Sequence, residues 1–300
     1  RLRELHIRAM YRLVDRFVSP SRFLRERYLA WGLDPASVTV IPNGLPPAEP
    51  TPHRALPPGS ERRDRFAFFG HINGPKGAMV ALAASALLSR QGIPHRLALH
   101  GGADYQTEAF LASFRDALAA APEARHHGGY QRSELPALIA EADWVVMPSV
   151  WWENAPLVIQ EAFQHRRPVI VSGIGGMAEM VRDGIDGLHV RPDDPGALAA
   201  AMARAAADPA LWSALVGGIR PPGGIEAAAG ARGGGGGGGA AGRGWCSGWG
   251  VGLRPPVGIE AAAEAHLALY AALGAAVPKA RPARKRPAGA AAPRRTRRAA

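Results

Sequence analysis

Two glutamates carry the clearest chemical signal in the sequence. Glu153 and Glu161 stand eight residues apart in the run WWENAPLVIQEAF, and Asn154 and Pro156 between them are residue types that commonly begin a helix. On one helix, this spacing places the carboxylates about 12 Å apart along the axis and about 80° apart around it, so they share a face. The two carboxylates of a glycosidase lie about 5 to 9.5 Å apart, so the spacing disfavours direct hydrolysis. It fits two carboxylates that hold opposite ends of one long ligand, with a diphosphate at the helix amino end between them.

A lysine earlier in the chain supplies the opposite charge. Lys76 lies in the run GHINGPKG, directly after a predicted strand, where a cation can neutralise the charge on a departing nucleoside diphosphate. The run resembles a P-loop only in part, because Gly77 follows Lys76 where that motif needs a Ser or Thr to bind magnesium. We therefore interpret Lys76 as a phosphate-binding residue outside the P-loop class.

A glycine turn offers main-chain donors to the same ligand. Gly175, Gly176 and Met177 begin the run GGMAE, which ends at Glu179. At a strand-to-helix turn, backbone amides such as these can approach a sugar or a phosphate. The alternative is that the glycines only make a tight turn.

The elements that must position these residues alternate regularly from Arg65 onward. Short apolar runs expected to be strands (FAFFG, RLALHG, RHHGGY, DWVVMPS and PVIVS) alternate with helical patterns over 78–90, 107–120, 133–141, 157–164 and 177–182. Strands that are apolar on both faces, separated by helices of about ten residues, predict an α/β fold with a Rossmann-like parallel sheet and helices on both faces. In such a sheet ligands bind beyond the carboxyl ends of the strands, which here means the loops after Phe69, His100, Tyr130, Pro148 and Ser172.

Composition divides the rest of the chain. Residues 1–48 contain an expected helix from Leu2 to Phe17, a helix from Arg22 to Trp31 and the strand runs RFVSPS and VTVIPNG, as at the end of an N-terminal Rossmann-like domain and its hinge. Residues 49–64, rich in Pro and charge, are expected to be a linker, and 65–216 form the predicted Rossmann-like domain. The run IRPPGGIEAAA recurs as LRPPVGIEAAA around a glycine run. We therefore interpret 217–250 as a dispensable low-complexity insertion, 251–274 as the C-terminal helix and 275–300 as a disordered basic tail.

Positive charge is concentrated in that tail. The formal net charge is +11, but the last 26 residues carry nine Lys or Arg and no Asp or Glu, which leaves 27 basic against 25 acidic residues elsewhere. A nearly neutral body argues against a nucleic-acid-binding core, so no specific nucleic acid partner is expected. The tail from Lys279 to Arg298 is expected to be solvated, with contact to an anionic membrane as the alternative. A single cysteine, Cys246, and the absence of an apolar run of membrane-spanning length favour a cytoplasmic protein, peripheral at the inner face of the membrane if the tail binds there.

Several of these runs together resemble one known family. VIPNG, GHINGPKG, DWVVMPS, ENAPLVIQEAF and RPVIVSGIGGMAEMVRDGIDGLHV are similar to segments of the retaining glycosyltransferases of family 4, over about residues 12–216 and the last helix. The resemblance implies a GT-B fold, of which this chain holds the C-terminal, nucleotide-sugar-binding domain while the N-terminal domain is mostly missing. It implies transfer of a sugar from a UDP- or GDP-sugar donor to a carbohydrate or lipid-linked acceptor, with retention of anomeric configuration.

The resemblance also implies roles for individual residues. Glu153 would contact the hydroxyls of the sugar, and Glu161 would accept hydrogen bonds from the ribose diol. Glu153 and Lys76 are the two residues expected to be catalytic. Many members have an Arg five residues before the lysine, where this chain has His71, and this departure weakens the expected diphosphate clamp. The other donor-binding residues implied are Gly70, Tyr130 (where the family holds the nucleobase through main-chain groups), Asn154, Pro156, Leu157, Gly175, Gly176 and Met177.

We expect the site to work without a metal or another cofactor. Adjacent residues of a strand point to opposite faces, so His126 and His127 are unsuited to joint metal binding. The sequence has no Asp-x-Asp pair, which the metal-dependent glycosyltransferase fold usually needs.

Three interpretations of the whole chain stay open. In the first it is part of an enzyme and is inactive as this piece alone, because the family's histidine near the anomeric carbon belongs to the N-terminal domain. In the second it is a catalytically silent nucleotide-sugar-binding module or partner subunit. In the third, the main function of the chain lies in the basic tail, which anchors the protein to nucleic acid or to an anionic membrane. A further Rossmann-like pattern upstream of Arg1 would favour the first, and a start codon there the second.

Overall fold

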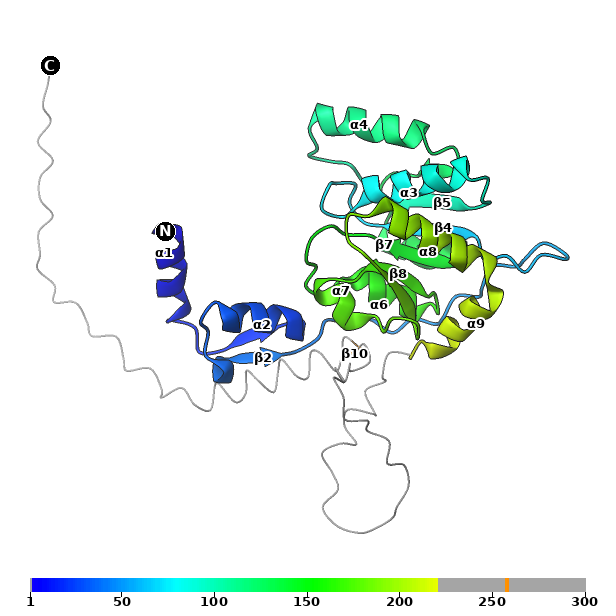
Figure 1. Ribbon diagram of the computed structural model, residues 1–300. Coiled ribbons are helices and arrows are strands. Elements are labelled where there is room, and N and C mark those ends of the chain that lie inside the picture. The colour runs from blue at the N-terminus through cyan, green and yellow to red at the C-terminus, as the bar shows by residue number, and fades with distance from the viewer. Residues whose placement is uncertain (1, 221–256, 259–300) are drawn as a thin grey trace, which may run out of the picture.

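The computed structural model describes residues 2–220 and 257–258. Its largest element is a six-stranded, wholly parallel sheet in the order β6-β5-β4-β7-β8-β9 (Figure 1). The strand order changes direction between β4 and β7, and such a switch point is where open α/β sheets bind ligands. The strands are β4 (Arg65–Phe69), β5 (Arg96–His100), β6 (Ala124–His126), β7 (Trp144–Met147), β8 (Val169–Ser172) and β9 (Gly187–Val190).

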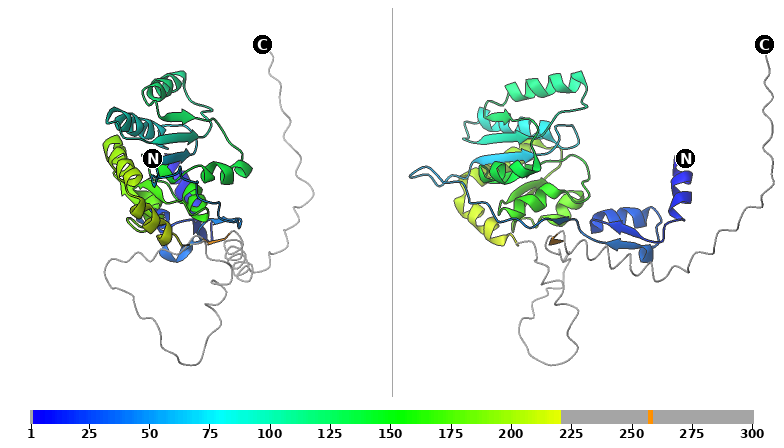
Figure 2. Two further views of the ribbon diagram at one scale, coloured as in Figure 1. Left: turned by 90° about the vertical axis from the view of Figure 1, so that its right-hand side faces the viewer. Right: turned by 180° about the vertical axis from the view of Figure 1, so that it is seen from behind.

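Helices cover both faces of this sheet (Figure 2). One face packs against α3 (Ala78–Arg90), α4 (Glu108–Ala119), α8 (Pro195–Ala207) and α9 (Pro209–Gly218). The other face packs against α5 (Leu135–Ala140), α6 (Leu157–Gln164) and α7 (Gly175–Met180). The predicted α/β class, a parallel sheet with helices on both faces, is therefore confirmed.

Each strand contributes to two cores, because successive residues of a strand point to opposite faces. In β4, Phe66 and Phe68 join the core that contains α3 and α8, whereas Ala67 and Phe69 join the core that contains α5 and α6. All four are at most 3% exposed. The body of the sheet is thus filled by apolar packing, and polar chemistry is left to the loops at the strand ends.

The N-terminal segment lies beside the large sheet, on the side of α6 and α7 (Figure 1). Its elements are α1 (Leu2–Tyr11), β1 (Phe17–Ser19), α2 (Arg22–Ala30), the 3-10 turn η1 (Pro35–Ser37), β2 (Val38–Val40) and β3 (Gly44–Leu45). β1 pairs in parallel with β2, and β3 pairs in parallel with β10 (Val257–Gly258). The helix expected to reach Phe17 ends at Tyr11, because Phe17 starts β1 and packs its ring edge-on against Tyr11, with centroids 5.1 Å apart.

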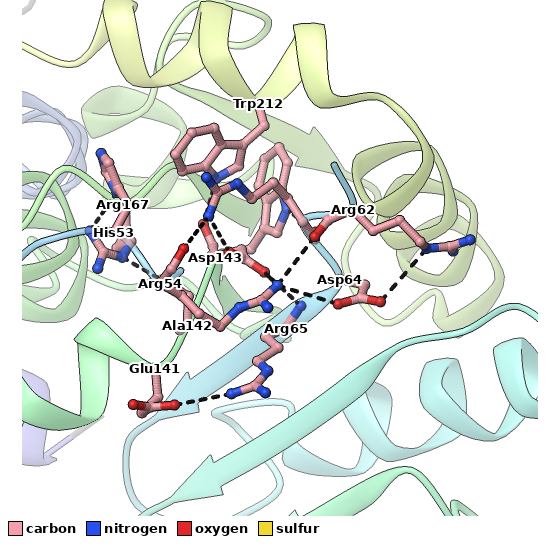
Figure 3. Close-up of polar contacts among 12 residues, drawn as sticks. His53, Arg54, Arg62, Asp64, Arg65, Glu141, Ala142, Asp143, Arg167 and Trp212 are labelled. Atoms are coloured by element: carbon pink, nitrogen blue, oxygen red, sulfur yellow. Dashed lines mark hydrogen bonds and ion pairs between the residues drawn. The ribbon is translucent and has the colours of Figure 1, made fainter. Parts of the chain in front are cut away.

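The predicted linker is bound across the amino edge of the sheet by buried charge (Figure 3). Asp143 directly precedes β7, and its side chain is 0% exposed. Its carboxylate accepts from Arg54 at 2.6 Å, from Arg63 at 3.2 Å and from the main-chain amide of Arg65 at 3.1 Å. Both side-chain donors belong to the segment 49–64, so this one carboxylate fixes the linker to the domain.

A third cation, the buried Arg167, completes this network (Figure 3). The guanidinium of Arg167 donates to the carbonyl oxygens of Ala142 at 2.8 Å and Pro52 at 2.6 Å, and to His53 Nδ1 at 2.9 Å. Burial first, and then the charges of Arg167 and Arg63, lower the pKa of His53 to about 4. His53 is therefore neutral near pH 7 and can accept the bond from Arg167.

The end of the folded domain lies a few residues later than the expected boundary at 216. Gly217 and Gly218 belong to α9, and Ile219 is buried in the core at 2% exposure. Arg182 also donates to the Gly218 carbonyl at 2.7 Å. Deleting the whole of 217–250 would therefore remove core contacts, and its start at 217 is wrong.

Three expected segments lie outside the described residues: the rest of the insertion, most of the C-terminal helix at 251–274, and the tail at 275–300. Within 251–274 only Val257 and Gly258 are described, and they form β10. None of the described helices is both long and apolar enough to cross a membrane.

Candidate functional site

The loops after β4, β7 and β8 pack against one another at the carboxyl edge of the sheet. An added Cβ on Gly77 would stand 1.9 Å from the Pro148 carbonyl oxygen, and one on Gly176 would stand 1.9 Å from the Asn154 carbonyl oxygen. No side chain fits at either contact, so glycine is required at both. Three of the loops predicted to carry the site therefore form one continuous surface.

Glu153 does not share a helix with Glu161, which corrects the expected geometry. Pro156 is the N-cap of α6, so Glu153 and Asn154 lie in the preceding loop, and Asn154 does not cap the helix. A proline disfavours the helical conformation of the residue before it, which stops the helix from extending back to Glu153. The separation of about 12 Å and 80° expected for two residues of one helix does not describe this pair.

Glu153 is a buried carboxylate with three donors on one oxygen. Its Oε1 accepts from Lys76 Nζ at 2.8 Å, Ser149 Oγ at 3.0 Å and Trp151 Nε1 at 3.1 Å. The residue is 8% exposed, so protein donors rather than bulk water hold its charge in place. The two residues predicted to be catalytic are thus in contact, which the sequence did not predict, and the carboxylate is fixed in one orientation.

Two helix amino ends flank this ion pair. α3 starts directly after the lysine loop with Gly77 as its N-cap, and α6 starts after the loop that carries Glu153. No side chain caps either helix. Uncapped amino ends present main-chain donors and partial positive charge, and Lys76 has two N–H donors beyond the ion pair. This arrangement can bind an anion such as a diphosphate.

Glu161 lies in a second cluster, within α6. Its Oε1 is 3.9 Å from Arg132 Nη2, which belongs to the 3-10 turn η2 (Arg132–Glu134). Burial raises the pKa of Glu161, and the charge of Arg132 opposes that rise. Burial, and then the charge of Glu161, raise the pKa of the nearby Tyr130 hydroxyl. A carboxylate in this setting is a strong acceptor for a diol, which is the role expected of Glu161.

A stack of rings lies beside this second cluster. Phe69 stacks on His100 with centroids 5.0 Å apart, His100 stacks on His127 at 4.8 Å, and Tyr130 packs edge-on against Phe69 at 5.7 Å. Burial, and then the charges of His127 and His126, lower the pKa of His100 to about 4. The stack therefore carries a neutral His100 near pH 7, with Phe69 and His100 buried beneath this part of the edge.

Gly70 and His71, both predicted to contact the donor, hold the loop after β5. His71 Nε2 lies 2.8 Å from the carbonyl oxygen of Asp104, so this nitrogen carries a proton. An added Cβ on Gly101 would stand 1.8 Å from the Gly70 carbonyl oxygen, so the two backbones touch. His71, at the place where many members of the family have an arginine, thus has a partner within the protein, as a plain loop histidine would.

The glycine turn after β8 is only partly as expected. The Gly176 amide, predicted to approach the sugar or phosphate, instead donates to the Glu153 carbonyl at 2.7 Å. The side chain of Met177 is fully buried in the core. Gly175 has φ of +60°, a conformation that glycine adopts readily. For Gly176 and Met177 the tight-turn alternative is therefore the better description.

Two family models match the chain. The model described as "Glycosyl transferases group 1" matches residues 63–208, and the one described as "Glycosyltransferase Family 4" matches residues 1–49. The chain thus carries a glycosyltransferase group 1 domain at 63–208, preceded by a family 4 segment at 1–49.

Two curated relatives carry the names of a glycogen synthase and a glycosyltransferase, and a solved structure shares the fold. The chain is 32% identical over 175 residues to a glycogen synthase of Mycobacterium tuberculosis, covering 58% of this chain and 41% of that protein. It is 31% identical over 202 residues to a D-inositol 3-phosphate glycosyltransferase of Actinosynnema mirum, covering 62% and 48%. The fold matches HepE of Anabaena, solved with UDP and glucose, with a TM-score of 0.61 at 18% identity, covering 72% of this chain and 61% of that one. The chain spans less than half the length of the two curated relatives.

Sequence reasoning missed three polar residues of this candidate site. Ser149 and Trp151 bind Glu153, and Arg132 lies beside Glu161. Ser149 and Trp151 stand within four residues of Glu153 in a loop already predicted to carry chemistry, so proximity along the chain was a usable signal. Arg132 stands two residues after Tyr130, in another loop predicted to carry the site, but only the fold shows that it lies beside Glu161 of α6.

Other features of the described residues are not among the predicted donor contacts. A cavity of about 370 Å³ lies against β4, β5 and β6, and its lining includes His100 and His127 of the ring stack but no residue predicted to bind the donor. His126 packs edge-on against Phe114 of α4 at 5.2 Å, on the face opposite His127 and its stack, as expected for neighbours in a strand. Within 2–220 and 257–258, no three His, Cys, Asp or Glu side chains gather as a metal-binding group.

Proposed function

We propose that the protein transfers a sugar from a nucleoside-diphosphate sugar to an acceptor, with retention of anomeric configuration, and that this chain binds the donor. The observation that carries the proposal is the ion pair between Lys76 and Glu153, set between the uncapped amino ends of α3 and α6. One surface thereby offers donors for phosphates and an oriented acceptor for hydroxyls. The UDP and glucose named with HepE are the ligand chemistry that we extend to this chain.

In this proposal each charged residue serves one part of the donor. Lys76 and the two helix amino ends bind the diphosphate and stabilise the charge that develops on it as the sugar leaves. Glu153, oriented by Ser149 and Trp151, accepts from the sugar hydroxyls. Glu161 accepts from the ribose diol. Because burial raises the pKa of Glu161, nucleotide binding should weaken as the pH falls and this carboxylate takes up a proton.

We further propose that this chemistry needs no metal or other cofactor. A fixed ammonium and helix amino ends can neutralise a leaving diphosphate without an ion. The acceptor is proposed to be a carbohydrate or a lipid-linked carbohydrate. Reaction in the cytoplasm, with the basic tail in peripheral contact with the inner face of the membrane, would bring the donor domain to such an acceptor.

Calorimetric titration of the chain with UDP, UDP-glucose, GDP and GDP-mannose tests the proposal. Lys76→Ala removes a charge-assisted contact, so the affinity for both the diphosphate and its sugar should fall about ten- to a hundredfold. Glu161→Gln should also weaken both ligands, because both carry the ribose. Glu153→Gln should lower the affinity for the nucleotide sugar and leave the affinity for the bare diphosphate nearly unchanged.

The matched control is Glu141→Gln, at an exposed residue that pairs with Arg65 on the opposite edge of the sheet. It should change none of the affinities. Equal losses for both ligands in Glu153→Gln would contradict the sugar contact. If none of the nucleotides binds the wild-type chain, donor binding by this chain is wrong.

A further inference from the structure

One carboxylate of the donor domain caps a helix of the N-terminal segment. Glu179, in α7, accepts from the main-chain amides of Arg22 at 2.9 Å and Phe23 at 2.7 Å, the first two residues of α2. The hydroxyl of Ser21 accepts from the Leu24 amide at 3.2 Å, in the usual manner of an N-cap. Three of the four amides that a helix leaves unpaired at its amino end are therefore satisfied, two of them by a residue from another part of the chain.

The same helix touches the loop that carries Glu153. The ring of Phe23 packs edge-on against Trp152 with centroids 5.9 Å apart, and the guanidinium of Arg27 lies 5.5 Å from the centre of the Trp152 ring. Asn43, just before β3, donates to the Ala155 carbonyl at 3.2 Å. The N-terminal segment thus contacts residues on both sides of Glu153.

α7 completes the connection from its other end. The Gly176 amide donates to the Glu153 carbonyl at 2.7 Å, and the contact leaves no room for a side chain. Gly176 and Glu179 lie one helical turn apart in α7, so a single short helix binds the backbone of Glu153 and the amino end of α2. A shift of α2 relative to α7 would therefore act on the Glu153 loop through two contacts, that of α2 with Trp152 and that of Gly176 with the Glu153 carbonyl.

We propose that Glu179 is a positioning residue, which fixes the N-terminal segment against α7 and thereby holds the Glu153 loop in its sugar-binding arrangement. The charge matters, because a carboxylate accepts from two amides and matches the positive amino end of α2. A glutamine at this position offers one acceptor oxygen and turns an amino group toward the second amide. The sugar-binding part of this inference rests on the proposed function of Glu153.

Hydrogen exchange followed by mass spectrometry tests the connection in the full chain without any ligand. In Glu179→Gln, exchange should rise about tenfold or more at the first amides of α2, as expected for a lost charge-assisted bond, and should also rise in the 151–155 loop. Ser21→Ala removes a cap from the same helix without touching α7, so it should raise exchange in α2 only. Glu108→Gln, which changes an acidic residue in the first turn of α4, is the matched control and should affect neither region.

Two outcomes would overturn the inference. Faster exchange in α2 without any change in 151–155 would make Glu179 a helix cap and nothing more. The same pattern in Ser21→Ala as in Glu179→Gln would show that the stability of α2, rather than the carboxylate, controls the loop. Glu179→Asp keeps the charge with a shorter reach, and it should give a smaller rise in both regions if Glu179→Gln folds poorly.

Binding supplies a readout that a purely structural role would not move. Glu179→Gln should weaken UDP-glucose more than UDP, by about fivefold or more, because only the sugar contact depends on the Glu153 loop. If Glu179→Gln left both affinities at their wild-type values, or lowered both by the same factor, the positioning role would be contradicted. If wild type itself binds neither, the proposed function fails while the exchange experiment still decides whether Glu179 holds the loop.

Discussion

At the scale of single residues, burial sets the protonation state of a histidine next to the candidate nucleotide site. His100 is 6% exposed and lies between the rings of Phe69 and His127. Its pKa in the folded protein is lowered from 6.5 to about 4, chiefly by burial. The unfolded chain therefore binds a proton at His100 between these two pH values while the folded chain does not.

This difference predicts a loss of stability in acid. The contribution of His100 is fully present above about pH 6.5, declines as the pH falls, and is lost below about pH 4, by an amount on the order of 2–3 kcal/mol. His100→Phe keeps a stacked ring that cannot take up a proton, so unfolding free energies measured by urea denaturation should fall less steeply between these pH values. The pKa of His53 is also lowered to about 4, so part of the slope should persist. An unchanged slope in the variant would assign the acid sensitivity to other groups.

At the scale of elements, the buried carboxylate of Asp143 and the buried Arg167 together hold the linker to the domain. Asp143 has no exposed side-chain surface and binds Arg54, Arg63 and the amide that starts β4. Arg167 adds another buried positive charge to the same region. Removing the negative partner of buried cations costs more than the pair contributes, because the cations stay desolvated without a counter-charge.

Asp143→Asn should therefore destabilise the domain by about 3–5 kcal/mol and expose the linker to proteases. Urea denaturation and limited proteolysis within 49–64 measure the two effects. Glu141→Gln is the comparison, since it breaks an ion pair with Arg65 in which Glu141 is 75% exposed, and it should cost less than about 1 kcal/mol. Similar losses in the two variants would mean that the buried network does not hold the linker.

At the scale of the whole molecule, the chain separates a nearly neutral body from a strongly basic end. The nine basic residues after Leu273 lie outside the described structure, and their sequence alone motivates a prediction. Attraction to anionic lipid is about 1 kcal/mol per basic residue near the surface and is screened by salt. The tail and the donor site are therefore expected to act independently.

Truncation after Leu273 should abolish salt-sensitive binding to vesicles that contain anionic lipid and should leave nucleotide affinity unchanged. Co-sedimentation with anionic and with neutral vesicles measures the first effect, and calorimetry the second. A truncated protein that lost nucleotide affinity would place the tail in the donor site and contradict the division into body and tail.

The sequence by itself determined the α/β class, and it predicted the edge of the sheet and three charged residues for the candidate site. These properties depend on short stretches of sequence, because burial on both faces makes a strand continuously apolar and because helices have their own periodicity. The sequence also contained the signal that Glu153 precedes α6, in the proline at 156, although the expected geometry placed both glutamates on one helix. The strand β9 was not predicted individually, since GLHV begins with a glycine that packs against the Val169 carbonyl and has little strand pattern of its own.

Only the tertiary structure decided which of these residues meet. Lys76 and Glu153 are 77 positions apart, and Glu179 reaches amides more than 150 positions earlier in the chain. No local pattern encodes such pairs, because they depend on how closely loops approach at glycines such as Gly77 and Gly176. The role of Gly176 changed for the same reason: its amide is a free donor in a turn considered alone, and it is taken once the fold brings the Glu153 carbonyl to 2.7 Å.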